Sequence, residues 1–438
     1  MRSTKNGIWM FVLVTGVVFT RAVSLANAQE GGEAPAANAG HEAECQVLNL
    51  DQCIALALKQ QPALQAHQSS LMAAETNRRA VENLLIPSLI ARELPIRRKQ
   101  AAMGVTVASA GLKQAELETI YAVTRLYYSV IFAREQRKVA QKVVGEIQRT
   151  ALTVKLGLSQ GEKEVRESDL NKVNMYLKLA EAKVAEAETG IRRARAALQE
   201  AIGLGACGCV EVADEGFPEL TLKICLQDII NMALANRGEM IQADTVAEVM
   251  GLEVEAQKTT FRPRFHTFAA VADIHARPIP QGESNGEYRP GALGPEMPTT
   301  LVGSRRMRVE RAEHFYTRAT AVAEKTANLI ALDAEDAFLK VEAALKQVAL
   351  TRAAVEQARI LIPRLEKDYP TRRKRPGAGA TEELLRNYVV AAQAEAQYNE
   401  ARFKLIIALA GLERATGGGF SAGLYSPIRD GACSLPRP

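Results

Sequence analysis

Two stretches of 40 residues, 176 positions apart, follow the same sequence pattern without a gap. They span residues 50–89 and 226–265. The matched positions are Leu50 and Leu226, Ile54 and Ile230, Ala57 and Ala233, Leu58 and Leu234, Leu64 and Met240, and Pro87 and Pro263. A fixed offset over this length, closed by the same helix-stopping proline, predicts one structural unit that is used twice.

The composition favours long packed helices over a large compact core. The chain has 438 residues, enough for two or three ordinary domains or one elongated one. Aromatic residues make up only 5% of it, and its one tryptophan, Trp9, lies near the N-terminus. Ala, Leu, Val, Glu, Lys, Arg and Gln dominate instead, as is typical of long helices.

The N-terminus has the features of a secretory signal peptide over residues 1–28. A positively charged start precedes the apolar run Ile8–Phe19, and the small-residue motif Ala26–Ala28 follows it. The apolar run is shorter than the ~20 residues that a membrane-spanning helix needs. We therefore expect an exported protein that begins at Gln29, with residues 29–44 as a flexible lead-in.

Two segments repeat apolar residues every three and four positions, which is the spacing of a coiled-coil seam. The first seam contains Leu170, Val173, Leu177, Ala180, Val184, Ala187, Ile191, Ala194 and Leu198. The second contains Leu384, Asn387, Ala391, Ala394, Tyr398, Ala401, Leu405, Ala408 and Leu412. Because alanine lets helix axes approach closely, both segments are predicted to pack tightly in long helical hairpins.

The predicted fold is mainly α, with internally duplicated long coiled-coil hairpins that form an α-barrel protomer. The first structural repeat covers residues 45–205 and the second covers residues 223–416, with a linker at 206–222. Residues 417–438 begin with several glycines and are predicted to be a disordered tail.

Each repeat is expected to contain one longer inter-helix loop with short β segments. In the first repeat this membrane-side loop is residues 88–110, which include Pro95 and a β-like run from Gly104. In the second it is residues 264–304, which are rich in Pro and Gly. A further break is expected at residues 363–380.

Six cysteines allow disulfides in an exported protein, with 15 possible pairings. Five of them lie near the starts of the two repeats: Cys45, Cys53, Cys207, Cys209 and Cys225. We predict a structural staple in this region and leave its connectivity open.

The sequence shows no catalytic constellation, so we expect no enzyme, no cofactor and no metal site. The five histidines are scattered, and no phosphate-binding glycine motif or nucleophile elbow is present. Four carboxylates lie near the two sharp turns: Glu162, Glu164, Glu382 and Glu383. They either line a cation-selective entrance or act as first-turn acids at helix N-termini, and we favour the second interpretation.

The charge balance does not favour a nucleic-acid partner. The formal net charge is +5 over the whole chain, and export makes such a partner less plausible still. Basic residues cluster at Arg92–Lys99, Arg305–Arg311 and Arg364–Arg375. We interpret these clusters as solvated loops and helix ends.

The chain resembles the TolC family of outer-membrane efflux proteins. The opening of the first repeat, with Leu48–Leu50, Ala55–Leu58, Pro62–Leu64 and Leu85–Leu89, is similar to the LTLxxAIxxALxxNPxLxxA…LLPSL opening of that family. The second repeat shows the pattern again at Met232–Arg237 and at Arg262–Pro263, and Leu412–Gly418 is similar to the way these chains commonly end.

The resemblance implies a homotrimer in the cell outer membrane that extends into the periplasm. It implies a passive conduit, with a β-barrel and a helical tunnel, that serves a tripartite efflux or type I secretion system. A periplasmic adaptor protein and an inner-membrane pump would be the partners. The contact with the adaptor would lie at the hairpin tips, which map to Gly157, Leu158, Ser159, Gly379, Ala380 and Thr381.

The chain departs from the family pattern at the membrane-side loops. Residues 88–110 are too few for two membrane strands of ~10 residues each. Prolines in the second loop also disfavour a regular hairpin. We therefore predict a divergent member with shortened barrel loops. The alternative is a periplasmic coiled-coil scaffold without a functional membrane pore. A periplasmic adaptor would need flanking β-rich segments, which the sequence lacks.

Overall fold

The fold is seen in a computed structural model, which describes residues 46–85, 91–162, 165–205, 209–213, 216–218, 225–260, 303–373 and 379–425. All of these residues belong to one compact unit, Glu44–Pro438. The predicted signal peptide, the lead-in to residue 44 and nearly all of the loop at 264–304 lie outside the described residues.

In the described ranges, the first half of the unit contains four helices. They are α1 (Leu50–Gln60), α2 (Pro62–Glu82), α3 (Leu94–Ser159) and α4 (Glu167–Ile202). Asn49 begins α1 with a capping box, in which its side chain accepts from the Gln52 N–H and the Gln52 side chain accepts from the Asn49 N–H. These two bonds satisfy backbone donors that a helix N-terminus otherwise leaves unpaired.

The second half repeats this order of helices. It contains α5 (Leu226–Asn236), α6 (Gly238–Thr259), α8 (Arg305–Arg373) and α9 (Ala380–Ala415). The first and last residues of α5 each lie 176 positions after those of α1. The matched stretches of sequence therefore fold into matched helices.

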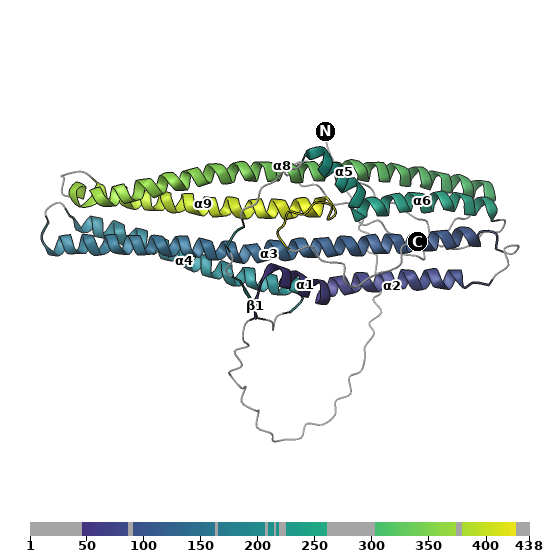
Figure 1. The fold of residues 1–438 in the computed structure, drawn as a ribbon, viewed down its shortest axis with the longest axis horizontal. Coiled ribbons are helices and arrows are strands. Elements are labelled where there is room, and N and C mark those ends of the chain that lie inside the picture. Colours follow the sequence, from purple (N-terminus) through teal and green to yellow (C-terminus); the bar gives the residue numbers. More distant parts are fainter. Residues whose placement is uncertain are drawn as a thin grey trace, which may run out of the picture. The chain divides into compact units, whose positions relative to one another are not determined.

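The long helices pack as two antiparallel hairpins, α3 with α4 and α8 with α9 (Figure 1). Helix α3 also packs against α9. Helix α2 packs against α3, and α6 packs against both α3 and α8. The main core contains residues from both halves, such as Tyr127, Leu198, Ile330 and Leu412. Burial of these apolar side chains joins the two repeats into one unit. The prediction of a mainly α fold built from paired hairpins is confirmed.

The described residues include two short strands, and they pair outside the inter-helix loops. Strand β1 (Gln46–Leu48) runs parallel to β2 (Val210–Val212), with Gln46 opposite Val210. Strand β1 precedes α1, and β2 lies in the linker between the repeats. These two strands thus lie at the junction of the two repeats, and nearly all of the second loop in which β segments were predicted lies outside the described residues.

The predicted loop at residues 88–110 is wrong over most of its length. Helix α3 already begins at Leu94, with Pro95 in its first turn, where proline is tolerated. The β-like run from Gly104 is helical because Val107 packs against Val246, Val249 and Met250 of α6. Tertiary packing here overrides the strand propensity of valine and threonine.

The break predicted from residue 363 is also wrong. Helix α8 continues through Pro363 and Pro370 to Arg373. Both prolines lie on the exposed side of the helix. Water can therefore reach the carbonyl groups that a proline leaves without a backbone donor.

The start of the predicted disordered tail is packed. Residues 417–425 leave α9 without helical structure, yet Leu424 is buried in the main core and Phe420 packs against it. The Ala422 backbone N–H donates a hydrogen bond to Glu413 Oε1, with 3.4 Å between the nitrogen and the oxygen. The remainder, residues 426–438, lies outside the described residues.

Candidate functional site: the hairpin tips and the junction of the repeats

The tips of the two hairpins lie against each other. Leu385 of α9 is fully buried in a cluster with Val154 of α3 and Val173 of α4. Beside this cluster, the Lys172 Nζ lies 2.8 Å from Glu382 Oε2. The hydrogen bond and charge of Lys172 lower the pKa of the Glu382 carboxyl. Two turns that are distant in sequence thus form one surface.

Arg373, the last residue of α8, links its hairpin to the tip of the other. Its guanidinium lies 2.7 Å from Glu162 Oε2 and donates to the Thr153 carbonyl at 3.0 Å. The side chains of Arg373 and Glu162 are 12% and 25% exposed, so water screens this pair only in part. The tip of α3 is therefore held by a charge from the second repeat.

The tip of the second hairpin has its own polar contacts. The Tyr369 hydroxyl lies 3.0 Å from Thr381 Oγ1, and Arg372 lies 2.6 Å from Glu383 Oε2. Burial raises the pKa of Tyr369. Glu382 and Glu383 lie in the first turn of α9, as the favoured interpretation of these acids predicts, and both also form ion pairs. Glu164 lies outside the described residues.

The structure divides the six predicted contact residues into two groups. Gly157, Ala380 and Thr381 are buried inside the chain, and Leu158 is half-buried. Ser159 and Gly379 are exposed. The neighbouring residues Gln160 and Gly161, which are not among the six, are also exposed. The glycine at 161, with φ of 69°, was the signal that marks the turn itself.

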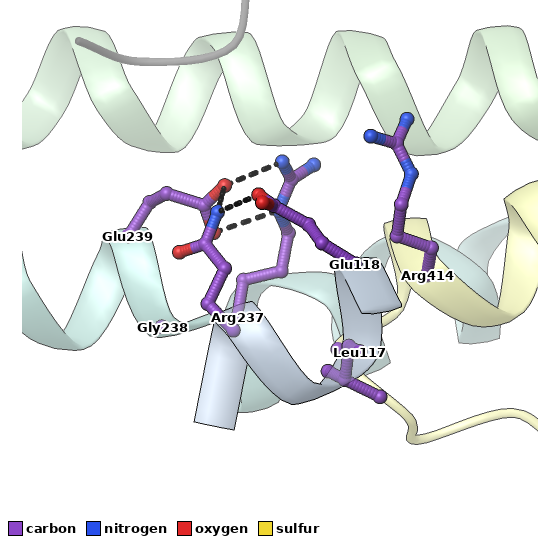
Figure 2. A pocket seen from close by; sticks show the side chains of 8 residues that line it. Leu117, Glu118, Arg237, Gly238, Glu239 and Arg414 are labelled. Carbon is purple, nitrogen blue, oxygen red and sulfur yellow. Dashed lines mark hydrogen bonds and ion pairs between the residues drawn. The ribbon is translucent and has the colours of Figure 1, made fainter. Parts of the chain in front are cut away.

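A second polar cluster joins the repeats beside the N-terminal third of α3 (Figure 2). Arg237 lies 2.9 Å from Glu239 Oε1 and 2.5 Å from Asp333 Oδ2 of α8. The Gln114 side chain of α3 donates to the same Glu239 carboxylate. Burial acts to lower the pKa of Arg237, but Glu239 and Asp333 outweigh it and raise that pKa. No sequence pattern pointed to this cluster, because its members come from three helices.

The small pocket at this cluster is lined mostly by polar side chains that pair with one another. Arg414 of α9 lies over the Tyr121 ring, 5.0 Å from its centroid, at the side of the pocket. The other polar groups that line it pair with one another across α3 and α6. Charge pairing and ring packing therefore occupy most of these polar groups, while Gln114 Oε1 and Arg414 Nε have no hydrogen-bond partner among the described residues.

The cysteines agree only in part with the predicted disulfides. Cys53 and Cys225 are free thiols, so their predicted role in disulfides is wrong. Cys53 of α1 is buried in the main core, where it acts as a small apolar side chain. Cys209 is disulfide-bonded. Cys45 and Cys207 lie outside the described residues. Within the described ranges, no group of three or more His, Cys, Asp or Glu side chains is placed to hold a metal ion.

Comparisons with known proteins give matches by structure but none by sequence. No protein-family model and no curated protein sequence matches the chain. Several solved structures do match it. The outer-membrane channel OprN has a TM-score of 0.67 at 16% identity, over 84% of this chain and 90% of that one. The open MtrE outer-membrane channel of Neisseria gonorrhoeae has a TM-score of 0.64 at 16% identity, over 84% of this chain and 89% of that one. The CmeC outer-membrane channel of Campylobacter jejuni has a TM-score of 0.64 at 13% identity, over 85% of this chain and 86% of that one.

The chain has a TolC-like fold. The resemblance in the repeated motifs predicted this fold, and the comparison of whole structures confirms it. In the TolC-like fold of this chain, none of the helices in the described ranges is both long and apolar enough to cross a membrane.

Proposed function

We propose that this chain is the outer-membrane channel component of a tripartite efflux or type I secretion system. It acts as a passive conduit across the periplasm and the outer membrane, without catalytic chemistry or a cofactor. The energy for transport comes from the partner pump. The observation that carries the proposal is the pair of long hairpins packed side by side, in the arrangement of known outer-membrane channels.

A homotrimer is the assembly that we propose for the channel. The long helices expose large apolar side chains that packing within one chain leaves uncovered: Met175, Leu179, Leu339, Leu350, Ile360, Leu361, Val389 and Val390. Isolated exposed apolar side chains are ordinary, but a series of them along paired helices favours contact with further copies. Neighbouring hairpins of a closed ring would cover them.

The partners that we propose are a periplasmic adaptor protein and an inner-membrane pump. The exposed surface at the joined tips, with Ser159, Gln160, Gly161 and Gly379, is the part available for the adaptor. The buried tip residues Ala380 and Thr381 would act indirectly, because they hold the turn in shape through Tyr369.

One structural feature favours a second candidate, a periplasmic scaffold of TolC-like fold without a functional membrane pore. The connection from α2 to α3 spans only residues 83–93, which is shorter than the loop that the sequence predicts. A chain that kept the hairpins and lost the membrane part would serve as a spacer between other proteins.

Fractionation and conductance distinguish the two candidates. We expect the processed chain in the outer-membrane fraction, resistant to carbonate extraction. It should cross-link as a trimer and conduct ions in planar bilayers. A soluble protein after osmotic release, without conductance, would instead assign it to the scaffold. A monomer in both fractions would exclude the channel.

A further inference from the structure

We propose that three arginines beside the linker strand β2 bind a phosphate group, either as inorganic phosphate or as part of a soluble phosphate monoester. They are Arg134 and Arg137 of α3 and Arg195 of α4, and we call them the arginine cluster. The cluster shares no residue with the hairpin tips or with the cluster at Arg237. A phosphate site here goes beyond the proposed transport function.

Two of the arginines are held in place by β2. The Arg195 Nη2 lies 2.7 Å from Glu211 Oε1, and Arg134 pairs with the same oxygen. The Arg134 Nη1 also donates to the Val212 carbonyl at 2.7 Å. Because two helices and a strand fix these guanidinium groups before a ligand arrives, binding costs less side-chain entropy.

The third arginine adds a buried donor that lacks an acceptor. Arg137 follows Arg134 by three residues, a spacing that places both on one face of α3. Within the described ranges, the Nε atoms of Arg137 and Arg195 are buried and have no hydrogen-bond partner. A buried donor without an acceptor is destabilising. A water molecule would accept from these donors but would leave their charge unbalanced.

The positive charge of the cluster exceeds that of its acid. Three guanidinium groups and the one carboxylate of Glu211 leave a formal excess of two positive charges. Burial lowers the pKa of Arg195, and the charges of Arg134 and Arg137 lower it further, although Glu211 pairs with it. The three arginines therefore lie close enough to repel one another.

Three other acids are close to the cluster in the sequence. Glu135 is paired with Lys138, whose Nζ lies 2.8 Å from Glu135 Oε1. Asp214 and Glu215 follow β2 and lie outside the described residues. A variant that removes both of these acids is therefore included in the test.

A phosphate group matches the cluster in both charge and shape. A phosphate monoester carries a charge of about −1.5 to −2 at neutral pH and presents three strong acceptor oxygens. Guanidinium groups donate paired hydrogen bonds to such oxygens. A simple carboxylate such as acetate carries about half of this charge, so we expect the cluster to prefer phosphate.

Thermal stability and calorimetry test the proposal. Tm of the full processed chain is measured at about pH 7.5 in chloride, acetate, inorganic phosphate and glycerol phosphate at matched ionic strength, and isothermal titration gives the affinities. We expect a higher Tm with the two phosphates only. R137Q should weaken phosphate binding about tenfold. In chloride it should not lower Tm, because Arg137 then only repels its neighbours.

Two further variants serve as controls. Arg149 is an exposed arginine of the same helix and donates to the Gly145 carbonyl. R149Q should bind phosphate as the unchanged chain does. D214N/E215Q should bind phosphate at least as tightly as the unchanged chain, because it removes negative charge beside the cluster.

Four results would overturn the proposal. They are equal Tm in phosphate and acetate, equal phosphate affinity in R137Q and the unchanged chain, a fall in Tm of R137Q in chloride, and phosphate binding by D214N/E215Q alone. The last result would show that Asp214 and Glu215 already neutralise the cluster. Tighter binding of either phosphate compound supports the proposal and identifies the source of the phosphate group. None of these measurements depends on conductance, so the channel proposal is tested separately.

Discussion

Arg373 at the end of α8 lies 2.7 Å from Glu162 in the turn that follows α3. This ion pair crosses from the second repeat to the first, and the Thr153 carbonyl accepts a further hydrogen bond from the same guanidinium. Arg373 therefore couples the tips of the two hairpins, in addition to the pair of Lys172 with Glu382.

Substitution R373Q is expected to loosen the tip of the first hairpin. Loss of a partly buried charged pair and its hydrogen bonds should cost about 1–2 kcal/mol. Amide hydrogen exchange in residues 150–162 should become about tenfold faster as a result. R359Q is the control, because Arg359 pairs with Glu356 at the surface, where both side chains are more than half exposed. Equal exchange rates in the two variants would contradict the coupling.

Substitution G238A is expected to disrupt the contact between the repeats. A Cβ atom at Gly238 would lie 2.6 Å from the Ala110 carbonyl oxygen of α3, which is backbone and cannot move aside easily. Overpacking of this kind should lower the free energy of unfolding by about 1–3 kcal/mol, measured by urea denaturation.

The matched control for G238A is G145A, at a half-buried position in the C-terminal third of α3. A Cβ there would meet nothing within 4 Å. Alanine should therefore raise the free energy of unfolding by up to about 1 kcal/mol through its higher helix propensity. Destabilisation of similar size by both changes would show that the contact at Ala110 is not the cause.

The free cysteines should differ sharply in reactivity. Burial raises the pKa of the Cys53 thiol to about 12, and its side chain is inaccessible, whereas Cys225 is exposed. Because the thiolate is the reactive form, a maleimide should label Cys225 in the folded protein and Cys53 only after unfolding. Mass spectrometry of labelled peptides measures both sites. Rapid native labelling of Cys53 would contradict its burial.

The strand register predicts the partner of Cys209. Gln46 lies opposite Val210, and the residues that precede these two in the sequence are Cys45 and Cys209. Since Cys53 and Cys225 are free, we predict a Cys45–Cys209 disulfide. Peptide mapping without reductant should find it. C45S should leave Cys209 reactive, while C207S should not. A peptide linking Cys209 to Cys433 would show that the register argument fails.

The stability of the chain should depend on the ionisation of Glu413. Burial raises the pKa of its carboxyl. The folded state therefore binds the proton more tightly than the unfolded state. The resulting stabilisation is fully present below the unfolded pKa of ~4.3 and is lost as pH rises through the folded pKa.

Substitution E413Q should remove this part of the pH dependence. Tm measured from about pH 4 to pH 8 should fall less with rising pH in E413Q than in the unchanged chain. E400Q is the control, because Glu400 is exposed beside Lys404 and shares the same helix. An identical Tm profile in E413Q and the unchanged chain would contradict the role of burial.

The local sequence pattern was sufficient to predict the helices but not the residues at which they begin and end. The matched stretches predicted α1 and α5, and the heptads predicted α4 and α9, because helical periodicity is written in consecutive residues. The prediction of a loop at the start of α3 is wrong, since Val107 packs against α6, more than a hundred residues later in the sequence. The predicted break at the prolines of α8 is wrong for a related reason: the energetic cost of a helical proline depends on its exposure to water, which the sequence alone does not show.

The candidate site was predictable only in outline. Glycine marked both turns, so the tips could be placed. Which tip residues are buried depends on Tyr369 and Leu385, whose neighbours come from distant parts of the chain. The Arg237 cluster could not be predicted for the same reason, because Gln114, Glu239 and Asp333 meet only once three helices have packed.

The pairing of β1 with β2 has a consequence for the order in which the protein forms. It closes a loop that runs from Gln46 to Val210 and contains the whole first hairpin. Loop-closure entropy grows only slowly with length, so this closure costs little more than a short one. In a chain that emerges N-terminus first, β1 and β2 can thus pair as soon as residue 212 has emerged. The first half can then fold before the second half packs against it.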